Sequence, residues 1–251
     1  MINLGKEIKI PKIETKLEVK NEADSETAEL YLYGTIRQAY WWDDEDEENI
    51  ISAKGVKNAL KNLKGKNINV HINSGGGDVF ESIAIGNLLK QHDGKVNIVI
   101  DGLAGSGASV VAMAGEKISM FPNSMMMIHK AWTLALGNAD ELRKTANDLD
   151  KIDSAVKASY KNRFVGTEEE LNDLIAEESW LTAEECLAFG FCDEVIEESA
   201  EENAPQNSVK ENLFNKYKKN ITNKKKKNIQ AGDKKPALFN SFIKNKTGGN
   251  E

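Results

Sequence analysis

Two side chains near the middle of the chain have the types and spacing that acyl transfer needs. Ser106 lies among small residues, in the run A-G-S-G-A, after an apolar strand pattern and before an apolar helix pattern. His129 closes a second apolar run 23 residues later. A serine hydroxyl becomes an effective nucleophile when a base removes its proton and donors stabilise the oxyanion. The pair therefore predicts a nucleophile, Ser106, and its general base, His129.

Two glycine-containing turns are suited to supply main-chain donors for that oxyanion. The turn Gly75–Gly77 joins a strand pattern to a helix pattern, and Gly107 follows Ser106 at the start of another helix pattern. Glycine lets the N–H groups approach a ligand closely. Each well-placed donor stabilises the transition state by roughly 3 kcal/mol.

The residues alone leave other interpretations open. A G-S-G turn before a helix is most often a capped turn without chemistry. Enzymes of the crotonase type, which act on acyl-CoA, use the same strand–turn–helix oxyanion architecture without needing Ser106 or His129. The G-G-G turn also suggests a phosphate cradle, but neither a Walker A motif nor G-x-G-x-x-G is present.

The elements that must position these residues alternate regularly. From residue 28 to residue 115 the pattern reads strand–helix–strand–helix–strand–helix, which predicts right-handed crossovers and a parallel sheet covered by helices. In such sheets ligands bind at the carboxyl ends of the strands, where both turns fall. His71 lies within the strand predicted at 66–73, and we interpret it as structural.

The second half adds short strands at 118–121 and 124–129, and a helix that begins at Asn138 or Asp140 and runs to Phe164. Helices at 167–175 and 181–189 and a strand at 192–196 follow. One stripe of the long helix is apolar, so it should be buried within the chain or against a partner. The residues of this stripe are Leu142, Leu149, Ile152, Val156 and Tyr160.

Composition limits the function classes. The net charge of -7 divides unevenly: residues 201–251 hold 12 lysines and 5 acidic residues, which leaves -14 for residues 1–200. The acidic body argues against nucleic-acid binding, except through the basic tail. The acidic run at 40–48 is interpreted as a solvated loop, so no metal or cofactor is predicted. The sequence has no long apolar run, no secretory signal and only two cysteines. These features favour a cytoplasmic protein without membrane contact.

We predict three parts in the chain: an N-terminal arm at 1–27, one globular domain at 28–198, and a basic, disordered tail at 199–251. The tail is rich in lysine and asparagine and lacks the apolar residues that a core requires.

Three segments resemble the Clp protease proteolytic subunit family. I-N-S-G-G-G-D and the helix after it, at 72–92, resemble its I-N-S-P-G-G segment. G-L-A-G-S-G-A-S, at 102–109, resembles the motif around its active serine, and P-N-S-M-M-M-I-H, at 122–129, resembles the motif around its active histidine. The resemblance extends from about residue 28 to residue 196 in order and spacing. Details such as W-W-D and S-W-L-T-A-E-E are most similar to Clp-type head maturation proteases of tailed phages and prophages.

The resemblance implies a ClpP/crotonase-like α/β fold, with parallel sheets covered by helices and a long protruding handle helix. It implies Ser106 as the nucleophile, His129 as the base and later the acid, and the amides of Gly76 and Gly107 as the oxyanion hole. The long helix corresponds to the handle, which joins two heptameric rings in the housekeeping enzyme. Packing within the monomer is the alternative explanation of its apolar stripe.

The third member of the triad departs from the family pattern. The orienting aspartate of the family precedes a motif that is here Trp180–Ala183, and counting back reaches Leu174 or Ala176, which are not acidic. Without a carboxylate the imidazole can hold the wrong tautomer. A one-residue gap reaches Asp173, which we favour, and Glu177 and Glu178 are the nearby alternatives. Rearrangement on assembly, a main-chain carbonyl partner, or weak catalysis also remain open.

The resulting prediction is a serine endopeptidase that processes capsid or scaffold proteins during phage head maturation, in the cytoplasm of the bacterial host. It would act as a ring-forming homo-oligomer. One alternative is a housekeeping subunit that works with an AAA+ unfoldase. Another is a structural component of the assembly with little proteolytic activity.

Overall fold

The structure, a computed structural model, describes residues 14–40 and 50–196. The chain divides into two compact units, Met1–Asn203 and Ala204–Glu251, and all described residues belong to the first. Most of the acidic run at 40–48, the first 13 residues and the basic tail lie outside the described ranges. The domain boundaries therefore remain predictions.

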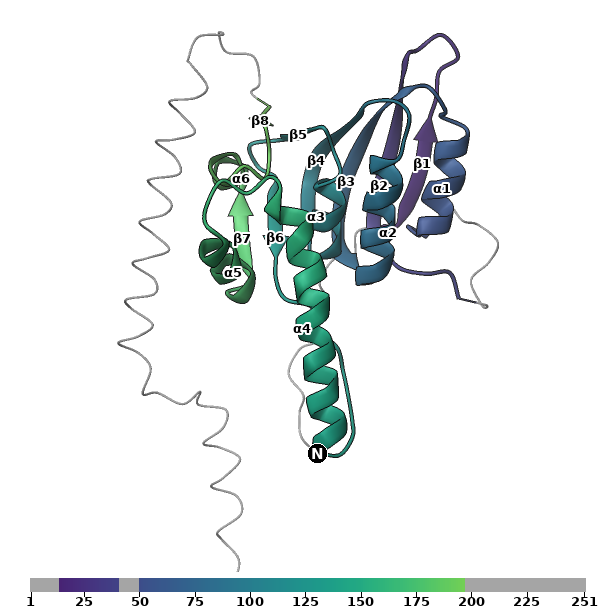
Figure 1. Ribbon diagram of the computed structural model, residues 1–251. Coiled ribbons are helices and arrows are strands. Elements are labelled where there is room, and N and C mark those ends of the chain that lie inside the picture. Colours follow the sequence, from purple (N-terminus) through teal and green to yellow (C-terminus); the bar gives the residue numbers. More distant parts are fainter. Residues whose placement is uncertain (1–13, 41–49, 197–251) are drawn as a thin grey trace, which may run out of the picture. The chain divides into compact units, whose positions relative to one another are not determined.

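One mostly parallel sheet organises the first unit (Figure 1). Its strands follow the order β1-β2-β3-β4-β5-β8, with β1 antiparallel to β2 and every later pair on this path parallel. This confirms the predicted α/β class. The strands are β1 (Lys16–Lys20), β2 (Thr27–Ile36), β3 (Asn67–Gly77), β4 (Val96–Gly105), β5 (Lys117–Met120) and β8 (Glu194–Val195).

Beyond this path the far end of β4 changes partner, and this change builds the site. Val99 and Ile100 pair with β5, whereas Leu103–Gly105 pair with β6 (Met125–Ile128), also in parallel. The antiparallel strand β7 (Ser179–Thr182) then pairs with β6. As a result, the carboxyl ends of β4 and β6 lie side by side.

Five of the six helices in the described ranges begin at a Ser, Thr, Asp or Asn side chain that caps their free N–H groups, as expected for these residues at this position. The helix α3 (Gly107–Ala112) is the exception, because its N-cap, Ser106, makes no capping hydrogen bond with its side chain. The capped helices are α1 (Ala53–Lys61), α2 (Val79–Lys90), α4 (Ala139–Lys161), α5 (Glu168–Ala176) and α6 (Ala183–Phe189). None of the helices in the described ranges is both long enough and apolar enough to span a bilayer.

Alternate residues of the central strands form the core. Leu30 of β2, Val70 of β3 and Ile98 of β4 are fully buried, on the face that α1, α2 and α3 cover (Figure 1). The opposite face carries polar side chains, among them Glu29 and His71. This alternation is the pattern that a sheet covered on one face requires.

Two strands formed where the sequence predicted other structure. β1 lies in the range assigned to a loose arm, where Leu17 is buried against α1. β7 includes Leu181 and Thr182, which were predicted to be helical. Thr182 is the N-cap of α6 and accepts a hydrogen bond from the Glu185 N–H, so the helix starts at Ala183.

The apolar stripe of α4 is buried only at its C-terminal end. Val156 and Tyr160 are 5% and 1% exposed, whereas Leu142 is 43% exposed and Leu149 and Ile152 are partly exposed. The C-terminal end lies beside α3, and the N-terminal half extends away from the sheet (Figure 1). Packing among the described residues therefore does not explain the whole stripe.

Candidate active site

Ser106 occupies the sharp turn between β4 and α3. Its φ of 51° and ψ of -123° put a non-glycine residue at positive φ, a conformation that costs about 1–3 kcal/mol and persists only where the surroundings enforce it. The Ser106 N–H donates to the Met127 carbonyl of β6 at 2.8 Å. The side chain is half-buried. Strain of this kind is typical of residues held for function.

His129 lies directly after β6 and meets this serine. Its Nε2 is 2.7 Å from Ser106 Oγ. In the neutral tautomer that carries its proton on Nδ1, Nε2 accepts a hydrogen bond from the Ser106 hydroxyl, which is the arrangement a general base requires. This distance is within the range that proton transfer to a general base requires. The pairing of β6 with the end of β4 brings the two residues together across 23 positions of sequence.

The glycine turn lies against the same serine. A Cβ added at Gly76 would be 2.9 Å from Ser106 Cβ and 2.6 Å from the Gly107 nitrogen, so only glycine fits there. However, the Gly76 N–H donates to Ser74 Oγ at 3.0 Å. The amide that was predicted as an oxyanion donor is therefore already engaged within the turn.

The next residue, Gly77, was not named as a donor from the sequence. Ile36 of β2 is the register partner of Gly77, and the Ile36 carbonyl accepts from the Asp78 N–H at 2.9 Å. In a parallel ladder this leaves the Gly77 N–H pointing away from β2, toward the β4 side. A Cβ added at Gly107 would lie 3.5 Å from the Gly77 nitrogen, so the two amides are neighbours. Three consecutive glycines carry no side-chain signal that distinguishes one of these amides from the next.

The three acidic candidates for the third position lie on α5 and just after it. Asp173 is within α5 and Glu177 is its C-cap. Glu178 follows at a φ of 52°, and the register Ile128↔Ser179, continued by one residue, sets it opposite His129. Within the described residues, no carboxylate hydrogen bonds to the His129 ring.

His71 has two carboxylate partners, whereas His129 has none among the described residues. Its Nδ1 is 2.9 Å from Asp101 Oδ2 and its Nε2 is 2.9 Å from Glu29 Oε2, while its ring stacks on Tyr31. The hydrogen bond to Asp101 and the nearby negative charges raise the pKa of His71 above its ordinary value. Tyr33 donates to the same Asp101 carboxylate at 2.6 Å. The cluster occupies the polar face of the sheet.

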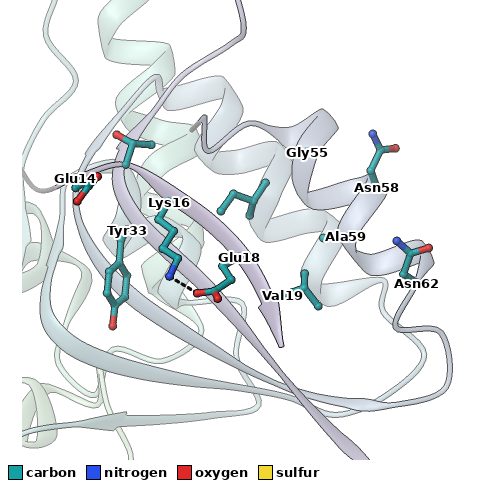
Figure 2. Close-up of a pocket in the computed structure, with 11 residues that line it drawn as sticks. Glu14, Lys16, Glu18, Val19, Tyr33, Gly55, Asn58, Ala59 and Asn62 are labelled. Atoms are coloured by element: carbon teal, nitrogen blue, oxygen red, sulfur yellow. Dashed lines mark ion pairs between the residues drawn. The ribbon is translucent and has the colours of Figure 1, made fainter. Parts of the chain in front are cut away.

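A pocket of about 920 Å³ lies between β1 and α1, as Figure 2 shows. Its lining includes the exposed ion pair between Lys16 and Glu18, and neither Ser106 nor His129 belongs to it. Elsewhere in the described ranges, no three His, Cys, Asp or Glu side chains gather in a way that could hold a metal ion.

Comparison with known proteins decides the family. A sequence model described as Clp protease matches residues 44–199, well over half of the chain. The chain belongs to the Clp protease family. The Ser106–His129 contact and the glycine turn lie inside the matched range. The sequence resemblance to this family is thereby confirmed.

Three curated relatives, each named ATP-dependent Clp protease proteolytic subunit, are similar to this Clp-family chain. One from Bacteroides fragilis is 30% identical over 134 residues, which are 53% of this chain and 65% of that protein. One from Deinococcus radiodurans is 31% identical over 137 residues, 53% of this chain and 67% of that protein. One from Leuconostoc citreum is 31% identical over 147 residues, 54% of this chain and 70% of that protein.

The chain spans 61–65% of the length of its relatives from two Bacteroides fragilis strains. None of these relatives is described as a phage protein, so the special likeness to phage head maturation proteases remains a prediction.

Proposed function

We propose that this Clp-family chain is a serine peptidase in which Ser106 is the nucleophile and His129 the general base. The observation that carries the proposal is the 2.7 Å separation of His129 Nε2 and Ser106 Oγ at the adjoining ends of β4 and β6. Family membership supports peptide bonds as the substrate class. The crotonase-type alternative does not need this pair, and the contact therefore favours the peptidase.

The residues divide the chemistry as follows. His129 Nε2 takes the proton as Ser106 Oγ forms a bond to the peptide carbonyl carbon. The negative carbonyl oxygen would be held by the main-chain N–H groups of Gly107 and Gly77, which replaces Gly76 in the predicted pair. When the C–N bond breaks, the imidazolium gives its proton to the leaving amine. Water then hydrolyses the acyl-enzyme with His129 again as the base.

We infer that the chain acts as a homo-oligomer, in the form of a ring. The segment that follows His129 exposes Trp132, Leu134 and Leu136 at 78%, 88% and 94%, and Leu142 of α4 is 43% exposed. Apolar side chains gathered at a surface in this way mark a protein interface. Charged substitutions at Leu134 and Leu136 should therefore lower the mass measured by light scattering, whereas an unchanged mass would contradict this interface.

We propose, as predicted from the sequence, that the biological substrates are the capsid or scaffold proteins of a phage head. The motif at 179–185, the W-W-D run and the lysine-rich tail support this choice. A housekeeping subunit that works with an AAA+ unfoldase is the alternative, favoured by the names of the curated relatives. Cleavage of a purified scaffold protein without ATP supports the first role. Cleavage that requires a hexameric ATPase supports the second.

A fluorophosphonate probe tests the chemistry directly. The probe should label the assembled protein at Ser106, as located by peptide mass spectrometry, and Ser106→Ala should abolish the label. Ser119→Ala is a matched control, because this serine lies in β5 and hydrogen bonds to Glu194. Absence of a label at Ser106 in the assembled protein would overturn the proposal and favour a structural component with little proteolysis.

A further inference from the structure

Both members of the Ser106–His129 pair are tied to one helix. We propose that Asp153 and Tyr160 of α4 are positioning residues for this pair, and this inference rests on the proposed function. Tyr160 acts on Ser106 through Ser109, and Asp153 acts on His129 through the main-chain N–H of Ala131. Neither residue reaches the reacting atoms.

On the nucleophile side a buried relay of hydroxyls connects α4 to Ser106. The Ser109 Oγ donates to the Ser106 carbonyl at 2.5 Å and lies 2.8 Å from the Tyr160 hydroxyl. Since Ser109 has one hydroxyl hydrogen, Tyr160 must donate to Ser109. Ser109 and Tyr160 are 0% and 1% exposed, so no water replaces either bond.

This relay acts on a strained residue. The Ser106 carbonyl also accepts from the Ser109 N–H at 3.0 Å, and the Ser106 N–H is held by Met127. A residue at a φ of 51° keeps this conformation only while its neighbours enforce it. The relay is therefore one of the restraints that keep the hydroxyl aimed at His129.

On the base side a carboxylate of the same helix holds the chain just after His129. Asp153 Oδ1 accepts from the Ala131 N–H at 2.7 Å, and the other oxygen is 3.9 Å from Lys130 Nζ. The Asp153 side chain is only 16% exposed. Ala131 is two residues beyond His129 and lies outside any strand or helix, so this bond restrains the direction in which the chain leaves β6.

The two residues that make these hydrogen bonds lie on one face of α4. Asp153 and Tyr160 are seven residues apart, which is about two turns or 10 Å along the axis. Val156, between them, is buried. Because a helix moves as a stiff unit, a displacement of α4 moves the Asp153 and Tyr160 side chains together. A misplacement of about 1 Å can cost about a hundredfold in rate.

The experiment uses the full chain and separates position from stability. Ser109→Ala and Tyr160→Phe each remove one hydroxyl, and the double variant removes both without leaving a buried polar group unpaired. Removing both partners of a bond is often nearly neutral for stability. We expect the double variant to unfold at nearly the wild-type urea concentration while its fluorophosphonate labelling rate stays at least tenfold lower.

Asp153→Ala should likewise slow labelling by about tenfold, and Asp153→Asn should restore most of the rate, because its amide oxygen still accepts from Ala131. Asp148→Ala is the matched control: this carboxylate lies on the same helix, is 52% exposed and pairs with Lys151. The proposal is overturned if the double variant has both the stability and the labelling rate of the wild type. It is also overturned if Asp153→Ala labels as fast as Asp148→Ala.

A second readout is independent of activity. NMR of histidine labelled with 13C at the ring Cε1 gives three signals, since the chain has three histidines. In the double variant and in Asp153→Ala, the His129 signal should move toward its position in Ser106→Ala. If the probe does not label the wild type, the proposed function fails, but the His129 signal still tests the positioning role. A His129 signal that does not move in these variants would overturn the positioning role.

Discussion

Two histidines of the same sheet illustrate different uses of one side chain. His71, on the polar face, is clamped between Asp101 and Glu29 and stacked on Tyr31. His129, at the strand ends, contacts a serine at 2.7 Å. The histidine with two carboxylate partners makes no hydrogen bond to Ser106. The one beside the strained serine has an Nδ1 that no described carboxylate meets.

The difference teaches that acidic neighbours alone do not mark a catalytic histidine. The two carboxylates around His71 favour its charged form, and an imidazolium cannot accept a proton. His129 must stay neutral to act as a base. A site for acyl transfer needs the nucleophile and the oxyanion donors first, and the orienting acid then improves the base.

The largest expected effect separates the two histidines. His129→Ala should lower the rate of fluorophosphonate labelling by about a thousandfold or more, as removal of a nucleophile or its base does in serine peptidases. His71→Gln should label at a rate within a few-fold of the wild type, since its contacts are to Glu29 and Asp101. Similar losses in the two variants would refute the contrast.

A second test concerns the main chain at the site. Gly77→Ala should reduce the free energy of unfolding by about 1–3 kcal/mol, because Gly77 has a φ of 149° and a Cβ there would overlap the Ile36 carbonyl. The displaced amide should also slow labelling, by about a hundredfold. Urea denaturation and probe kinetics measure the two effects.

Gly75→Ala is the control, because a Cβ at Gly75 would have no neighbour within 4 Å. If the two alanine variants behave alike, Gly77 has no special role.

The third test asks whether His129 gains an acid in solution. Glu178→Gln should slow labelling by about tenfold, since the β6–β7 register sets Glu178 opposite His129 and an orienting carboxylate favours the productive tautomer. Asp173→Asn and Glu177→Gln are the matched variants, and each should change the rate less. A larger loss in Asp173→Asn would return the role to the acid favoured from the sequence.

The smallest effect is a pH dependence at His71. Its pKa is raised above 6.5 in the folded chain, chiefly by the hydrogen bond to Asp101. The stability it contributes is therefore fully present below about pH 6.5 and is lost as the pH rises through the raised pKa. His71→Gln should destabilise the chain more at pH 5.5 than at pH 8.5, as measured by urea denaturation. An equal loss at both pH values would contradict a charged His71.

Much of the fold followed from local patterns. The strand–helix order from residue 28 to residue 115 and the helix start at Asn138 were predicted and are present in the structure, because these signals depend on a few neighbouring residues. β7 was missed, since a four-residue strand forms only when β6 lies beside it. The hydrogen bond from the Gly76 N–H to Ser74 Oγ was not foreseen, because three consecutive glycines carry no side-chain pattern that reveals register.

By itself the sequence determined the α/β class, the family, and the two residues that the proposal makes nucleophile and base. These depend on hydrophobic period and on short motifs. Only the tertiary structure decided that the hydroxyl and the imidazole meet at 2.7 Å, that the Gly76 amide is engaged by Ser74, and that one helix hydrogen bonds to both Ser109 and Ala131. The physical reason is that these relations join residues far apart in sequence, and strand register and side-chain packing set them only when the chain is folded.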